Sequence, residues 1–106
     1  MIEPLIMKIM TYSEIINSQP VVLVEFFATW CPHCQKMMPV VAQVKTLLDG
    51  RAAVYQLDID QNQQTAEEVG ANSIPTFILY RDGKEVWRHS GEIDGEVLLS
   101  KVESAL

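Results

Sequence analysis

The chain has few basic residues and no long hydrophobic run. Its 106 residues include 8 Lys and Arg against 14 Asp and Glu, a formal net charge of −6 at pH 7. This balance argues against binding to nucleic acid or to an anionic membrane surface, both of which need a basic patch. No apolar stretch approaches the roughly 20 residues of a membrane-spanning helix, so we expect no membrane insertion. Because 48% of the residues are apolar and 21% are charged, we expect a globular protein.

Targeting signals are also lacking. The first residues have no basic segment followed by an apolar core, so a cytoplasmic protein is expected. A periplasmic or secreted location stays open, because a chain whose signal peptide had been removed would look much the same. The length suits a single domain over residues 1–106.

Cysteine is scarce, and the only two cysteines lie together after a hydrophobic run. The segment that contains them consists of Trp30, Cys31, Pro32, His33 and Cys34. Residues 21–28 before it are mostly β-branched or aromatic with one charge, which predicts a strand buried on both faces. After it, apolar residues recur every three or four positions up to Leu48, which predicts a helix. The cysteines therefore lie where a central strand leads into a helix.

The spacing of the two cysteines suits dithiol chemistry. Residues three apart share one helix face, so their sulfurs can bond, or one thiol can donate to the other's thiolate. Cys31 is expected at the helix N-terminus, where free N–H groups and the helix dipole lower a thiol pKa and activate the nucleophile. Cys34 should be more buried and act as the resolving thiol. Pro32 suits the first helical position, because its missing N–H would be unpaired there.

The rest of the pattern predicts alternating strands and helices. The expected elements are a strand at 5–9, a helix capped by Thr11 or Ser13 and ending at 16, a strand at 21–28, a helix at 31–48 kinked at Pro39, a strand at 53–59, a helix at 61–69, a hairpin of strands 76–80 and 85–89, and a helix at 94–105. This order predicts an α/β fold with a mixed central β-sheet: parallel strands joined by crossover helices, one antiparallel hairpin, and helices on both faces. Reaction sites in such sheets lie beyond the carboxyl ends of the strands.

Taken together, these segments resemble a thioredoxin over nearly the whole chain. The matching residues are 24–34, Pro39, 58–60, 73–77, 82–84 and Gly91. The resemblance implies a thioredoxin fold and a cis peptide bond between Ile74 and Pro75 that faces the cysteines, with the Ile74 backbone free to pair with an extended substrate. A plain trans-proline is the alternative. Trp30 is expected to form part of an apolar rim that receives substrate, and Gly91 would let a partner's backbone approach.

The dipeptide between the cysteines departs from this family. Pro32 and His33 replace the usual Gly-Pro and resemble the dipeptide of the bacterial periplasmic dithiol oxidases. His33 can donate a hydrogen bond or a positive charge to the Cys31 thiolate, which would make the disulfide more oxidising. A solvent-facing histidine without such a role is the alternative. Those oxidases have a helical insertion before the cis-proline, and Cys31 and Pro75 lie too close in sequence to hold it.

An acidic residue in the central strand, Glu25, matches the buried aspartate of thioredoxins. Burial should raise its pKa, and its predicted role is to accept the proton of Cys34 when the mixed disulfide is released. The alternative is a glutamate that reaches solvent at the strand end. Thioredoxins often pair this acid with a lysine on the next strand. The matching residue here is Gln56, so Glu25 is expected to be still less willing to ionise.

These residues predict an enzyme, a thiol–disulfide oxidoreductase that reduces protein disulfides without a cofactor. Cys31 would attack and Cys34 would resolve the mixed disulfide. The expected partners are protein disulfides and a thioredoxin-reductase-like or membrane redox partner, and the chain is expected to be a monomer. The alternatives are an oxidase or isomerase in an oxidising compartment, a non-catalytic interaction module, and a metal site at Cys31, His33 and Cys34. No metal is expected, because a closed zinc site needs four ligands and only His89 remains.

Overall fold

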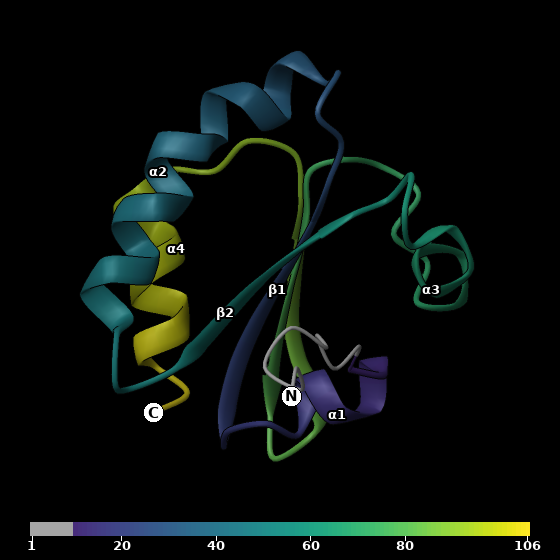
Figure 1. Ribbon diagram of the computed structural model, residues 1–106. Helices are drawn as coiled ribbons and strands as arrows, with labels where there is room; N and C mark the ends of the chain where they lie inside the picture. Colours follow the sequence, from purple (N-terminus) through teal and green to yellow (C-terminus); the bar gives the residue numbers. More distant parts are fainter. Residues whose placement is uncertain (1–9) are drawn as a thin grey trace, which may run out of the picture.

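The computed structural model describes residues 10–106, which alternate between helices and strands (Figure 1). The elements are α1 (Tyr12–Ile16), β1 (Val21–Phe27), α2 (Pro32–Leu48), β2 (Ala53–Asp58), α3 (Gln63–Glu68), β3 (Thr76–Arg81), β4 (Lys84–Ser90) and α4 (Gly95–Glu103). The strand predicted at residues 5–9 lies outside the described residues. No helix in this part of the chain is long and apolar enough to cross a membrane.

Local signals in the sequence set most of these boundaries. Thr11 caps α1 through its hydroxyl, which accepts from the N–H of Glu14 at 3.1 Å. Cys31 is the N-cap of α2, and Pro32 is its first helical residue, as predicted. The helix continues through Pro39, and Figure 1 shows it bending along its length, as expected for an interior proline.

The sheet has the strand order β2-β1-β3-β4. β1 pairs with β2 in parallel and with β3 in antiparallel orientation, and β3 and β4 form the predicted antiparallel hairpin. The mixed central sheet of the prediction is confirmed. The expectation that crossover helices join only parallel strands is wrong for the connection through α3, because β3 runs opposite to β1 and β2.

The strand pairing gives the direction of β3. β3 pairs with β1 in antiparallel orientation, so it starts at the end of the sheet where β1 and β2 finish. Phe26 near the end of β1 lies opposite Thr76 at the start of β3. The reversal thus brings the segment before β3 beside the segment after β1.

Helices cover both faces of the sheet, as predicted (Figure 1). One core contains Leu23 of β1 with the apolar sides of α2 and α4, and the other contains Val24 and Phe26 of β1 with α1 and α3. Alternate residues of β1 thus enter opposite cores, and all but the last are buried. Glu25 shares the parity of Leu23, so it points to the face covered by α2. This places a carboxyl group under the helix that holds the cysteines.

Candidate active site at the start of α2

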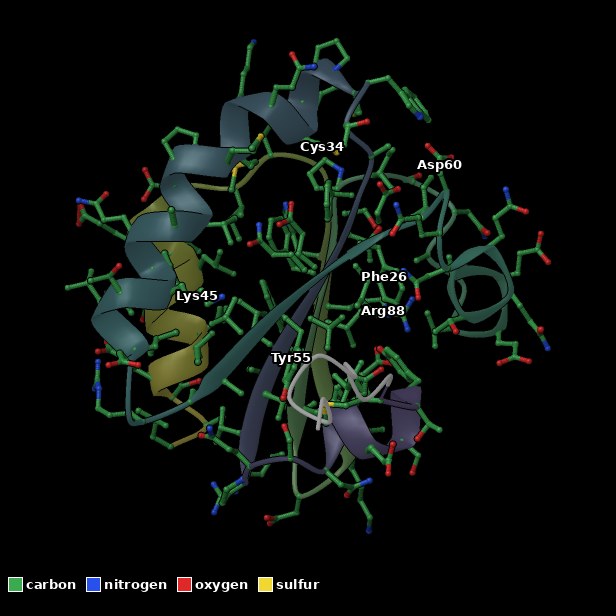
Figure 2. All side chains as sticks on the ribbon, viewed as in Figure 1. Phe26, Cys34, Lys45, Tyr55, Asp60 and Arg88 are labelled. Carbon is green, nitrogen blue, oxygen red and sulfur yellow. The ribbon has the colours of Figure 1, made fainter. Side chains whose placement is uncertain are left out.

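The two cysteines lie beyond the carboxyl end of β1, Cys31 as the N-cap of α2 and Cys34 in its first turn. Figure 2 labels Cys34 at this end of the helix. Both are free thiols and both are buried, with 6% of Cys31 and 2% of Cys34 exposed. They pack with Ala28 in a small cluster that Ile59 and Ile74 help to cover. The chain therefore holds two thiols at the edge of an apolar site, with Cys31 nearer the surface.

The environment of Cys31 favours its thiolate. Burial works against the charge, but it is outweighed by hydrogen bonds from the N–H and thiol of Cys34 and from the N–H of His33, so the pKa of Cys31 is lowered. The N–H groups are unpaired because they belong to the first turn of a helix. The negative charge of Glu92 acts against them and raises the pKa. His33 thus acts on the sulfur through its backbone N–H.

The environment of Cys34 favours its neutral thiol. Burial is the main cause that raises the pKa of Cys34, and the hydrogen bond and charge of Cys31 and the charge of Glu25 act in the same direction. The N–H of Ala28 opposes them, and the net result is a pKa of about 12. The pKa values of the two thiols are therefore shifted in opposite directions. Of the two thiols, Cys31 is the one whose ionised form the structure favours, and Cys34 is the one whose neutral form it favours.

Glu25 is a buried acid on the same side of the sheet as the cysteine helix. Only 2% of its surface is exposed, which does not fit the alternative of a glutamate that reaches solvent. Burial raises the pKa of Glu25, and the amide of Gln56, which donates to its Oε1 at 3.0 Å, only partly offsets this. Gln56 lies directly across the β1–β2 pair, at the position where the resemblance places a lysine. The neutral amide satisfies the carboxyl group without a charge.

The segment before β3 faces Cys31. The peptide bond between Ile74 and Pro75 is cis, as the resemblance implied. The Cys31 thiol donates to the carbonyl oxygen of Ile74 at 3.9 Å, and the N–H of Gly91 donates to the carbonyl of Pro75 at 2.7 Å. Gly91 has a φ of +98°, and a Cβ there would meet nothing within 4 Å. The space next to the Gly91 backbone is therefore free of other atoms of the described chain.

Trp30 is the most exposed of the large apolar residues described, at 62%. Its indole N–H donates to Oδ2 of Asp60 at 2.8 Å, and the N–H of Asp60 donates to Asp58 at 2.8 Å. Asp60 lies in the segment 58–60 that carries the resemblance, and no separate role was predicted for it. The structure shows that it orients Trp30 beside the cysteines (Asp60 is labelled in Figure 2). Its position two residues after the end of β2, a strand that pairs with β1, was the available signal.

The side chain of His33 is directed to the loop after β4. Its Nδ1 lies 2.5 Å from Oε2 of Glu92, and the two side chains are 65% and 40% exposed. Glu92 was not predicted as a site residue, although it directly follows Gly91. Among residues 10–106, no three His, Cys, Asp or Glu side chains come together as a metal site would require.

Comparison with known proteins agrees with this geometry. The Thioredoxin family model matches residues 3–104. The chain belongs to the thioredoxin family. Thioredoxin 2 of Chlorobaculum tepidum is 34% identical over 91 residues, which cover 86% of this chain and 84% of that protein. The chloroplastic thioredoxin Y2 of Arabidopsis thaliana is 37% identical over 85% of this chain, which spans 54% of that longer relative.

A solved structure confirms the thioredoxin fold. A mutant thioredoxin from Halobacterium salinarum superimposes with a TM-score of 0.78 at 36% identity, covering 88% of this chain and 80% of that one. Family membership and the paired cysteines together make this protein a thiol–disulfide oxidoreductase.

Proposed function

We propose that the protein reduces disulfides of other proteins, with Cys31 as the attacking thiolate. Attack on one substrate sulfur forms a mixed disulfide and releases the other substrate sulfur as a thiolate, which takes up a proton. Cys34 then loses its proton towards Glu25 and attacks the Cys31 sulfur. This forms the Cys31–Cys34 disulfide and releases the second substrate thiol, so two electrons pass from the protein to the substrate.

The split between the two thiols supports this assignment of roles most strongly. Cys31 lies at the helix N-terminus with a lowered pKa, whereas the pKa of Cys34 is raised to about 12 beside a buried acid. An attacking thiol must be ionised before the substrate arrives, and a resolving thiol needs to ionise only afterwards. In our proposal the Ile74 backbone, Pro75, Gly91 and Trp30 receive the substrate chain, and Pro32 starts the helix that polarises Cys31.

We also propose a domain organisation, an oligomeric state and a partner that returns the protein to its dithiol form. Residues 1–106 would form one domain that acts as a monomer in a reducing compartment, with the cytoplasm as the leading assignment. A thioredoxin-reductase-like protein or a membrane redox partner would reduce the Cys31–Cys34 disulfide after each cycle. The family membership and the acidic surface support these points, and size-exclusion chromatography with light scattering tests the monomer.

Reduction of insulin by the dithiol form tests the proposed reaction. The wild-type protein should accelerate the precipitation of insulin chains with dithiothreitol as the reductant. Cys34→Ser should accumulate a mixed disulfide with substrate, and Cys31→Ser should form none, because only the latter lacks the attacking thiolate. If Cys31→Ser formed the mixed disulfide and Cys34→Ser did not, the roles would be reversed. A wild-type protein no faster than Cys31→Ser would contradict the function.

The Pro32-His33 dipeptide favours a second candidate, an oxidase or isomerase that runs the same exchange in reverse. The equilibrium of the pair against glutathione separates the two. A potential near about −270 mV supports the reductase, and a value at or above about −180 mV supports the oxidase or isomerase in an oxidising compartment.

A further inference from the structure

His33 and Glu92 form a contact that the proposed reaction does not use. The residues are 59 positions apart in sequence, and the contact joins the first turn of α2 to the loop between β4 and α4. The hydrogen bond from His33 holds the pKa of Glu92 below its ordinary value, so this carboxylate is ionised at neutral pH. The charge of Lys36, on the same helix, contributes in the same direction. A fixed negative charge thus stands beside the dipeptide that separates the cysteines.

The backbone of Glu92 is held in place from two sides. The N–H of Gly91 donates to the carbonyl of Pro75, and the carbonyl of Glu92 accepts from Nε2 of His89 at 3.1 Å. The ring of His89 is itself stacked on Trp87, with ring centroids 6.0 Å apart. The loop is therefore bonded to Pro75, just before β3, and to His89 in β4. Glu92 can hold His33 without a large loss of its own conformational freedom.

The direction of the His33 ring bears on the redox poise. A positive charge or N–H donor aimed at the Cys31 thiolate would stabilise the reduced form and make the disulfide more oxidising. In this structure the Nδ1 donor is occupied by Glu92 instead. We propose that Glu92 is a positioning residue that turns the His33 ring away from Cys31. It thereby keeps the Cys31–Cys34 couple more reducing than the oxidase-like dipeptide would otherwise make it. The proposal rests on the proposed function of the two cysteines as a dithiol–disulfide couple.

The equilibrium with glutathione measures this effect. Two molecules of glutathione and the Cys31–Cys34 disulfide exchange to give the dithiol and one glutathione disulfide, so atoms and two electrons balance. Glu92→Gln removes the charge and keeps the size of a side chain that is 40% exposed. We expect the equilibrium constant to shift towards the dithiol by about two- to fivefold, the scale of an exposed ion pair, which is about 10–20 mV for a two-electron couple.

Two further variants give the measurement its controls. Glu96→Gln removes the same charge from the exposed first turn of α4 and should leave the equilibrium unchanged. Thiolate absorbance at 240 nm, followed against pH, should show Cys31 ionising at lower pH in Glu92→Gln than in the wild type. In a His33→Ala background, Glu92→Gln should have a smaller effect on both readouts, because the ring it positions is gone.

Two results would overturn the proposal. If Glu92→Gln matched Glu96→Gln, Glu92 would have no special influence on the couple. If its full effect persisted in the His33→Ala background, the carboxylate would act by its charge alone, directly or through Lys36. Neither readout involves the disulfide of a substrate protein. Failure of insulin reduction together with a shifted equilibrium would therefore overturn the proposed function and leave this inference standing.

Discussion

At the scale of single residues, a carboxyl group is buried inside the central strand. Glu25 sits among apolar neighbours with one neutral partner, the amide of Gln56. A fold that needed only stability would place an apolar side chain there, since burial penalises the ionised form. In the proposed mechanism the same raised pKa makes Glu25 a base for the otherwise unreactive thiol of Cys34.

The raised pKa of Glu25 predicts how stability depends on pH. The folded state binds the proton more tightly than the unfolded state, so wild-type stability falls as pH rises from the ordinary carboxyl range through the raised pKa. The side chain in Glu25→Gln cannot ionise, so the variant does not lose stability in this way as pH rises. We expect the variant and the wild type to have similar urea midpoints in acid, and the variant to be the more stable above neutral pH. Glu67→Gln on the exposed side of α3 is the control, and a pH-independent difference for Glu25→Gln would contradict the burial argument.

Two residues of the site, Asp60 and Glu92, could be identified only from the folded structure. The Trp30–Asp60 bond joins residues 30 positions apart, and the His33–Glu92 contact joins residues 59 apart. The motif around the cysteines identified Trp30 and His33, but a pattern of near neighbours in sequence does not reveal partners so far along the chain. The motif around Cys31 and Cys34 was readable because its chemistry depends on local spacing and on a helix start.

At the scale of elements, α2 both supports the core and displays the cysteines. Its adjacent residues Leu47 and Leu48 differ sharply in environment, with 53% and 0% of their surface exposed. Leu48→Ala should lower the free energy of unfolding by about 2–5 kcal/mol, because it leaves a cavity between α2 and the sheet. Leu47→Ala, the matched control, should stay within about 0.5 kcal/mol. Equal losses in urea unfolding would show that α2 packs with a different face.

The loop after β4 offers a second test at this scale. Gly91 and Gly50 both have positive φ values, +98° and +80°, and a Cβ at either would meet nothing within 4 Å. Alanine at either site should therefore cost about 1–2 kcal/mol of stability through backbone strain. Only Gly91→Ala should also raise the KM for insulin, because Gly91 lies beside Pro75 and Gly50 follows the far end of α2. A raised KM in both variants would mean that lost stability, not substrate approach, explains the effect.

At the scale of the whole molecule, the sequence pattern predicted which strands are buried better than it predicted the direction in which each strand runs. The uninterrupted apolar run of β1 indicated a strand covered on both faces, and helices do cover both. The orientation of β3 could not be predicted in the same way, because an apolar strand has the same pattern in either direction. It depends on the end of the sheet to which the connection through α3 leads. That reversal places Pro75 against Cys31, so the site depends on the least predictable part of the topology.

The central claim is that one fold gives two neighbouring thiols opposite tendencies to ionise. Titration of thiolate absorbance at 240 nm in the wild type, Cys31→Ser and Cys34→Ser tests it most directly. Cys34→Ser should keep a transition below the ordinary thiol pKa, and Cys31→Ser should show only a transition at high pH, because burial raises the pKa of Cys34 to about 12 in the wild type. If Cys31→Ser kept the low transition, Cys34 would be the activated thiol and the proposed mechanism would be wrong.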